Sequence, residues 1–207
     1  FIGGGYRNTS SADLSFVGGG LINCIGAAMS SIVGGCSNKT FGGCSFIGGG
    51  ISNSITTNDA YTVIVGGQSN TVESSWSSIV GGCLNIVSDQ HSFIGGGYTN
   101  DINNGKYSSL VGGYNNCINT SGNCNFLGGG KNNCIYSSAD LSFIGGGESN
   151  KLACNGVVIV GGGSNEATGC LSFVGGGFSN QVCACYGTIL AGCANRISGS
   201  TDVERSS

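Results

Sequence analysis

The 207-residue chain has no proline, one histidine, one tryptophan and few charged residues, with seven basic and ten acidic side chains. The basic residues stand singly and the net charge is -3, so no positive stripe is available to bind nucleic acid or an acidic membrane surface. No apolar run approaches the roughly 18 to 20 residues that a membrane-spanning helix needs. The sequence therefore predicts neither a nucleic-acid partner nor a membrane span.

Glycine and cysteine are abundant instead, with 42 and 12 residues. Glycine-rich sequences of low charge can be disordered, but disordered chains are poor in aliphatic residues, and here aliphatic residues recur throughout. The glycines therefore need a structural explanation. An even, high number of cysteines is typical of an oxidising, extracellular setting, although cysteine is also a small and easily buried apolar residue.

One short unit recurs thirteen times, and its most regular form is S-F-I-G-G-G-x-x-N-x-I. Successive asparagines of the unit are 15 residues apart in eight of twelve intervals and 16 or 17 apart in the others, and the extra residues follow the asparagine. A fixed short period indicates a repeat architecture. The anchor asparagines are Asn8, Asn23, Asn38, Asn53, Asn70, Asn85, Asn100, Asn116, Asn133, Asn150, Asn165, Asn180 and Asn195.

Two columns of aliphatic residues predict the fold. One stands six residues before every anchor asparagine, and a second, mostly aliphatic, stands two residues after it. β-Branched residues dominate both columns, as in strands. We therefore predict an all-β protein, a parallel β-solenoid or β-roll of about thirteen rungs of 15–17 residues, over residues 1–197.

A polar exit segment, 198–207, follows the last repeat. Phe1 falls inside a repeat, and neither end has the sequence of the cap that a solenoid needs. We therefore expect the chain to be part of a longer fibre.

Glycine and asparagine occupy fixed positions in the unit. Glycine stands three residues before every anchor asparagine, and also four before it except in the last copy, which has Ala191. Such strictness suggests positive φ or close backbone approach. A phosphate-binding glycine loop occurs once, between a strand and a helix, so thirteen copies indicate architecture. We expect the asparagines to form a ladder in which each amide donates to the next rung; a row of ligand-binding amides is the alternative.

A further regularity links two positions, the one seven residues before the asparagine and the one five residues before it. Phenylalanine at the first is always followed by glycine at the second, whereas serine, valine or threonine is followed by valine or leucine. Residues i and i+2 of a strand share a face, so each rung places one bulky group there. Because voids and overpacking are both costly, we predict a second packed face made of Phe1, Phe16, Val33, Phe46, Val65, Val80, Phe93, Val111, Phe126, Phe143, Val160, Phe173 and Leu190.

This second face needs a cover, and the chain has no other domain to supply one. Identical chains around an axis are the simplest cover. We therefore predict a homo-oligomer, and in particular a trimeric rod. A broad monomeric solenoid that uses the face internally is the alternative.

The unit at residues 45–55 and 92–102 resembles the head repeat of YadA-type trimeric autotransporter adhesins, which has a Ser-x-Ala-Ile-Gly core at a similar period. It is also similar to the SFIGGG-type arrays of phage and giant-virus fibre proteins. The resemblance covers residues 1–197 and departs from the adhesin pattern in its glycine tract, its asparagine and its many cysteines. It implies a trimeric structural fibre or adhesin segment on a virion or cell surface, with a host receptor or glycan as partner.

The sequence predicts no enzyme, cofactor or metal site. The acids fall mostly in the variable segment on separate rungs, unlike the paired carboxylates of a tailspike glycosidase. The single His91 and the absence of a C-x-x-C motif do not fit zinc. A glycan-degrading tailspike and an ice-binding solenoid, which would use a regular serine column, are the alternative functions.

One cysteine pair falls in register. Cys117 and Cys134 each follow an anchor asparagine directly on consecutive rungs. Rungs about 4.8 Å apart lie within the Cα range of a disulfide. A disulfide and a column of buried thiols are the two readings of this pair.

Overall fold

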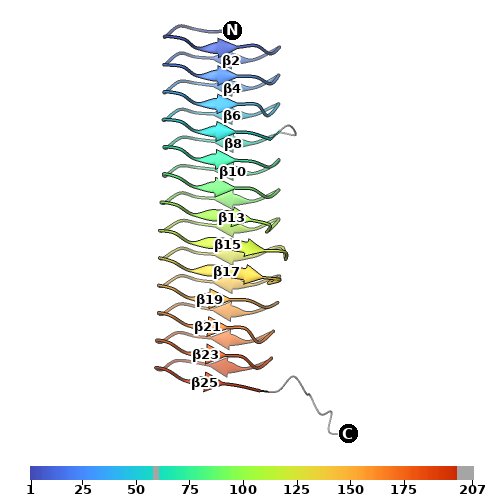
Figure 1. Cartoon of the computed structure of the whole chain (residues 1–207), viewed down its shortest axis with the longest axis vertical. Coiled ribbons are helices and arrows are strands. Elements are labelled where there is room, and N and C mark those ends of the chain that lie inside the picture. The colour runs from blue at the N-terminus through green and yellow to red at the C-terminus, as the bar shows by residue number, and fades with distance from the viewer. Residues whose placement is uncertain (58–60, 200–207) are drawn as a thin grey trace.

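The structure, a computed structural model, describes residues 1–57 and 61–199. This part of the chain forms a parallel β-solenoid of about twelve turns and contains no helix, as predicted for the fold class. The turns follow one another along a straight axis (Figure 1). Of the predicted exit segment 198–207, residues 200–207 lie outside the described residues.

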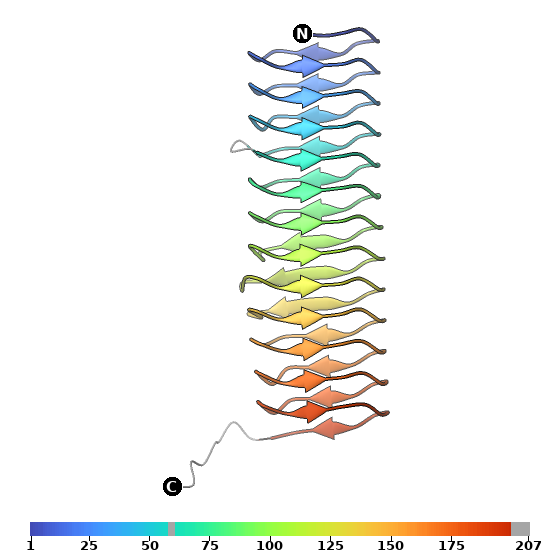
Figure 2. The same ribbon diagram turned by 180° about the vertical axis from the view of Figure 1, so that it is seen from behind.

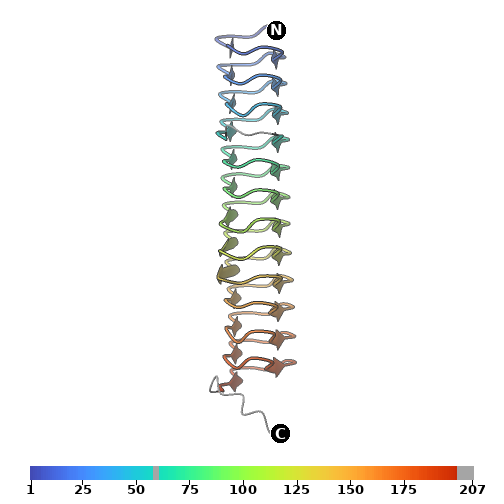
Figure 3. The same ribbon diagram turned by 90° about the vertical axis from the view of Figure 1, so that its right-hand side faces the viewer.

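Each turn contributes one short strand to each of two parallel sheets, which form the two broad faces of a flattened coil (Figures 2 and 3). The odd-numbered strands begin directly after the anchor asparagines and form the odd-strand sheet: β1 (Thr9–Ser10), β3 (Cys24–Ile25), β5 (Lys39–Thr40), β7 (Ser54–Ile55), β9 (Thr71–Val72), β11 (Ile86–Val87), β13 (Asp101–Asn103), β15 (Cys117–Thr120), β17 (Cys134–Ser137), β19 (Lys151–Leu152), β21 (Glu166–Ala167), β23 (Gln181–Val182) and β25 (Arg196–Ile197).

The even-numbered strands precede the glycine tracts and form the even-strand sheet: β2 (Phe16–Val17), β4 (Ser31–Ile32), β6 (Phe46–Ile47), β8 (Val63–Ile64), β10 (Ser78–Ile79), β12 (Phe93–Ile94), β14 (Ser109–Leu110), β16 (Phe126–Leu127), β18 (Phe143–Ile144), β20 (Val158–Ile159), β22 (Phe173–Val174) and β24 (Thr188–Ile189). The first copy adds an isolated bridge between Ile2 and Val17. Thirteen repeats therefore make thirteen odd strands but about twelve complete turns.

Every strand pairs in parallel with the equivalent strand of the next turn, and equivalent residues are exact neighbours across the pairing. Ser78 lies beside Phe93, and Ile86 beside Asp101. The Cα atoms of Cys117 and Cys134, which are paired in this way, are 4.7 Å apart. This distance is the ordinary spacing between hydrogen-bonded strands, so the repeat period equals one rung.

The core lies between the two sheets and consists of the two predicted aliphatic columns. From Val17 to Val182, the inward aliphatic side chains are completely buried. The polar or small residues Thr40 and Ala167 replace an aliphatic side chain in the second column and are also buried. The inward row of each strand therefore has one residue per rung, and the solenoid is only as thick as two such rows.

Two corners join the sheets in each turn. The Gly corner follows an even strand, and the variable corner follows an odd strand and contains the inserted residues. At both corners a non-glycine residue with positive φ precedes an inward polar residue and then a strand. Ile22 (φ 57°) precedes Asn23 at a Gly corner, and Met29 (φ 56°) precedes Ser30 at a variable corner. Each turn is thus two similar halves, which the alignment on asparagine alone did not predict.

The glycine three residues before each asparagine allows the rungs to approach closely. Gly82 has φ +86°, and a Cβ atom there would collide with the backbone of Gly97 on the next rung and with the amide of Asn85. Gly81, one residue earlier, faces open space. The last copy has Ala191 at the position of Gly81, whereas the position of Gly82 is glycine in all copies.

These two neighbouring glycines make a matched test. Gly82→Ala should lower the free energy of unfolding by at least about 2 kcal/mol, because positive φ and a backbone collision are both unfavourable. Gly81→Ala should change it by no more than about 0.5 kcal/mol. Urea unfolding followed by far-UV circular dichroism measures both, and equal effects of the two substitutions would contradict this account of the corner.

Candidate functional site

The asparagine column lies at the Gly corners and is part of the scaffold. The Asn85 side chain donates from Nδ2 to the carbonyl oxygens of Gly81 (3.0 Å) and Gly97 (3.1 Å). Its Oδ1 accepts the backbone N–H of Asn100 at 3.0 Å. Asn23 and the anchor asparagines that follow it up to Asn180 are all completely buried. Because the amide is buried and its donors and acceptor are used, these side chains are unsuited to bind a ligand.

The ladder differs from the simple amide-to-amide ladder that we expected. Its continuous link between rungs is the backbone N–H of one asparagine donating to Oδ1 of the previous one, from Asn23 to Asn195. Direct bonds from Nδ2 to the previous Oδ1 occur only on some rungs, at 3.0–3.3 Å: those of Asn53, Asn70, Asn85, Asn116, Asn133, Asn180 and Asn195. The Nδ2 groups from Asn8 to Asn180 all donate to two glycine carbonyls, whether or not they also make this bond.

The serine column at the variable corners has the same role. Ser30 Oγ donates to the carbonyl of Gly42 at 2.8 Å and accepts the backbone N–H of Ser45 at 3.3 Å. Asn125 replaces serine in this column and makes the equivalent bonds to Ala139 and Ser142. The column is buried, so it offers no hydroxyl array to ice.

The neighbouring residues Asn115 and Asn116 allow a buried ladder amide to be compared with an exposed amide. Asn116→Ala would leave the Asn133 N–H and the Gly112 carbonyl without their partners, at about 1–3 kcal/mol each, whereas the Gly130 carbonyl would still accept the Tyr114 N–H. We expect a loss of at least about 2 kcal/mol in unfolding free energy. The Asn115 side chain is exposed and donates to Asn132 Oδ1 at 2.9 Å, and serine occupies its position in several other copies.

Asn115→Ser should therefore change the unfolding free energy by less than about 0.5 kcal/mol. Denaturant unfolding of both variants checks this. A small effect of Asn116→Ala would show that the buried amide is dispensable.

The predicted second face is the outer surface of the even-strand sheet. In the single chain its side chains are partly exposed, for example Phe126 at 36% and Val33 at 50%. The phenylalanine–glycine exchange has a cause within one chain: the Phe16 ring lies over Gly18, 3.4 Å from where a Cβ would be. The ring thus fills the space that valine fills on other rungs. The outward face nevertheless remains a continuous apolar strip along the rod.

Two disulfides join neighbouring rungs. Cys117 is bonded to Cys134, the pair that shares a register, and Cys154 is bonded to Cys170. The second pair is four residues after one asparagine and five after the next, so the alignment did not bring it together. The other cysteines are free in the described part of the chain.

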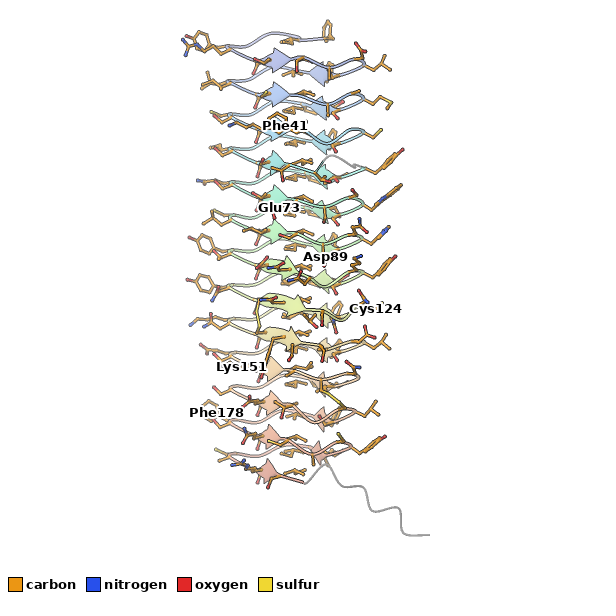
Figure 4. All side chains as sticks on the ribbon, turned by 45° about the vertical axis from the view of Figure 1, so that its right-hand side comes forward. Phe41, Glu73, Asp89, Cys124, Lys151 and Phe178 are labelled. Carbon is orange, nitrogen blue, oxygen red and sulfur yellow. A yellow bond between two sulfur atoms is a disulfide. The ribbon has the colours of Figure 1, made fainter. Side chains whose placement is uncertain are left out.

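The odd-strand sheet carries several charged side chains on its outer surface, where Figure 4 shows Phe41, Glu73 and Lys151. Glu166 accepts hydrogen bonds from Tyr136 (3.3 Å) and Gln181 (3.1 Å). Glu148 pairs with Lys131 at 3.1 Å at the Gly corner. Glu148 and Glu166, which stand on adjacent rungs, therefore have separate partners and do not form a carboxylate pair.

Burial, and to a lesser extent the nearby Glu73 carboxylate, raises the pKa of Asp101. The folded chain therefore binds a proton at Asp101 more tightly than the unfolded chain does, and this carboxyl lowers stability as pH rises through its folded pKa. Asp101→Asn should raise the unfolding free energy at pH 7, by no more than about 1 kcal/mol because the carboxyl is partly exposed. The gain should disappear as pH falls below the ordinary pKa of an aspartate.

Thermal unfolding of the variant and the parent chain between pH 3 and 8 measures this difference. Asp13→Asn, at an exposed acid of a variable corner, is the control. A gain that did not depend on pH would contradict the assignment to Asp101 ionisation.

The positive-φ position of the variable corner carries side chains that are exposed except for the half-buried Cys44, many of them large and apolar, in a column along one edge of the rod. Its members are Leu14, Met29, Cys44, Tyr61, Trp76, His91, Tyr107, Cys124, Leu141, Leu171 and Tyr186. Four successive aromatic rings stack, with centroids 4.3, 5.9 and 4.7 Å apart from Tyr61 to Tyr107. Sequence reasoning missed this column, although four consecutive copies carry a ring nine residues before the asparagine.

An open hollow of about 380 Å³ lies at the same edge and is lined by Asp89, Asn104, Lys106, Ser121 and Asn123. Figure 4 shows Asp89 and Cys124 at this edge and Phe178 at the opposite one. The intervals of 16 and 17 residues that follow Asn100 and Asn116 supply the longer loops here. The hollow is thus formed where the repeat departs from its regular length.

No group of three or more metal-ligating side chains occurs among residues 1–57 and 61–199. Within the same ranges no helix is long and apolar enough to cross a membrane. The chain matches no protein-family model, and its sequence matches no curated protein. The resemblance to fibre repeats therefore stands on the repeat motif itself.

Proposed function

We propose that the chain is a structural segment of an extracellular or virion fibre, a rigid rod that assembles from identical chains and presents attachment surfaces. Support comes first from its regularity. Every rung is bonded to its neighbours by two sheets and two buried polar columns, which resists bending and local opening.

The observation that carries the proposal is the apolar strip on the even-strand sheet. Twelve rungs at about 4.8 Å each make it on the order of 55 Å long. Large contiguous apolar patches on soluble proteins usually mark interaction sites. The outer surface of the odd-strand sheet, by contrast, carries charged and hydroxyl side chains such as Lys39, Thr71 and Glu166. This difference suits an assembly in which the even-strand sheet is covered and the odd-strand sheet faces solvent.

We propose that three chains cover this strip by packing their even-strand sheets around a common axis. In a three-fold arrangement each strip faces the axis and equivalent rungs lie at one level. The phenylalanine-or-valine alternation would then give each level a similar apolar volume. The resemblance to trimeric adhesin heads and to fibre arrays supports the same arrangement and the attachment role.

The experiment is the mass of the purified chain in solution, measured by light scattering after size exclusion. We expect three copies for the parent chain. Val80→Asp and Val111→Asp place charge on the strip and should yield single chains that keep their β-sheet circular dichroism. Thr56→Asp, on the outer surface of the odd-strand sheet, is the matched control and should remain trimeric.

A parent chain that stays single at micromolar concentration would overturn the assembly. An assembly that is insensitive to both valine substitutions would overturn the role of the strip. Loss of assembly in the threonine control as well would show that the substitutions act through general destabilisation.

A further inference from the structure

The aromatic ladder at the variable corners ends at Tyr107 with one ring face uncovered. His91 stacks on the other face, with centroids 4.7 Å apart and planes within 6° of parallel. The Tyr107 N–H donates to the Gln90 carbonyl of the preceding rung, and the Cys124 N–H of the following rung donates to the Lys106 carbonyl in the equivalent bond. The next side chain along the column is therefore that of Cys124, which is too small to cover the ring.

Tyr107 is also held in place. Its partner His91 stacks in turn on Trp76, and Trp76 on Tyr61, so the ring belongs to a four-membered stack. The side chain is still 57% exposed. A ring that is fixed by stacking on one face and open on the other is a preorganised flat apolar surface, because little side-chain entropy remains to be lost on binding.

The polar hollow lies at the same variable corners, although neither Tyr107 nor Cys124 is among its lining residues. Lys106 and Asn123 directly precede Tyr107 and Cys124 in the chain, and both line the hollow. The side chains of Asn104, Lys106, Ser121 and Asn123 form no hydrogen bond or ion pair with other groups in the described part of the chain. They offer amide, hydroxyl and ammonium groups to a ligand, and Asp89 adds a carboxylate acceptor.

We propose that Tyr107 and this hollow form a carbohydrate-binding site. A sugar ring has one face of C–H groups that packs on an aromatic ring and a rim of hydroxyls that both donate and accept hydrogen bonds. The open Tyr107 face and the mixed donors and acceptors of the hollow match these two features.

A nucleobase would also stack on the ring, but three observations favour a sugar. The hollow has no second aromatic wall to enclose a base. The net charge is negative, and no basic stripe follows the edge to hold a phosphate backbone. All five lining residues are polar, which suits a ligand with hydroxyls on several sides.

The site deepens the proposed attachment role and rests on it for its biological use. Binding itself does not depend on assembly, because the hollow lies at the edge and not on the apolar strip. A chain that failed to trimerise but bound sugar, or the reverse, would separate the two proposals.

The test is binding of the intact chain to a glycan array with neutral, sulfated and sialylated members, followed by calorimetric titration with the best oligosaccharide. Neutral and sialylated arms show whether Lys106 recognises an anionic sugar. Adenosine monophosphate is titrated in parallel. His91 is the only histidine, so its ring resonances report by NMR on ligand at the neighbouring Tyr107.

Two substitutions should impair binding by opposite means, one by removing the ring and one by covering it. Tyr107→Ala removes the platform and should weaken binding at least about tenfold, whereas Tyr107→Phe should keep it. Cys124→Trp extends the stack over the open face and should block the site, whereas Cys124→Ala should not. Tyr186→Ala removes an exposed tyrosine from the same column far from the hollow and should bind as the parent chain does.

Circular dichroism and thermal unfolding establish that each variant is folded. The absence of any glycan ligand, unchanged binding by both folded Tyr107→Ala and Cys124→Trp, or a preference for the nucleotide would each overturn the carbohydrate site.

Discussion

At each Gly corner a buried asparagine amide completes the hydrogen bonding of backbone that has just turned through a glycine tract. Its Nδ2 serves carbonyls on its own rung and the next, and its Oδ1 accepts the following asparagine N–H. Without it, two buried backbone groups per turn would lack partners, the glycine carbonyl of the same rung and the N–H of the next asparagine, and each such group is costly. The glycine at the third preceding position is required by the same contact, since any Cβ there would meet this amide and the next backbone.

The serine column makes similar hydrogen bonds between rungs at the variable corners. The bonds that join the rungs therefore lie inside the coil, and the residues of the outer surface can vary. The even-strand sheet uses that freedom for an apolar strip, and the odd-strand sheet for charged and hydroxyl groups. The variable corner contains the inserted residues, and the polar residue that follows them, such as Ser108, Asn125 or Ser142, keeps its place in the buried column. The proposed roles follow this division: assembly through the strip, and recognition at the corner where the repeat is least regular.

Sequence periodicity predicted the strands, the buried aliphatic columns and the register that joins Cys117 to Cys134, because all of these repeat with the rung. It did not reveal that Phe16 lies over Gly18. The sequence shows the same exchange of phenylalanine and valine whether the ring packs within its own chain or against a partner chain. It also missed the Cys154–Cys170 pair and the stack ending at Tyr107. The two cysteines stand at different distances from their asparagines, so only the folded loops show that they meet. The rings share one register, nine residues before the asparagine, but other copies have leucine, methionine, cysteine or glycine there, which obscured the column.

The central claim is that buried side-chain amides join the rungs. Residue-resolved hydrogen exchange tests it most directly, through the backbone amides of interior anchor asparagines such as Asn85, Asn100 and Asn116, which donate to a side-chain oxygen of the preceding rung. We predict that these amides exchange as slowly as those of the adjoining strands, because both open only when the rungs separate. Fast exchange at the asparagines within otherwise protected strands would contradict the account.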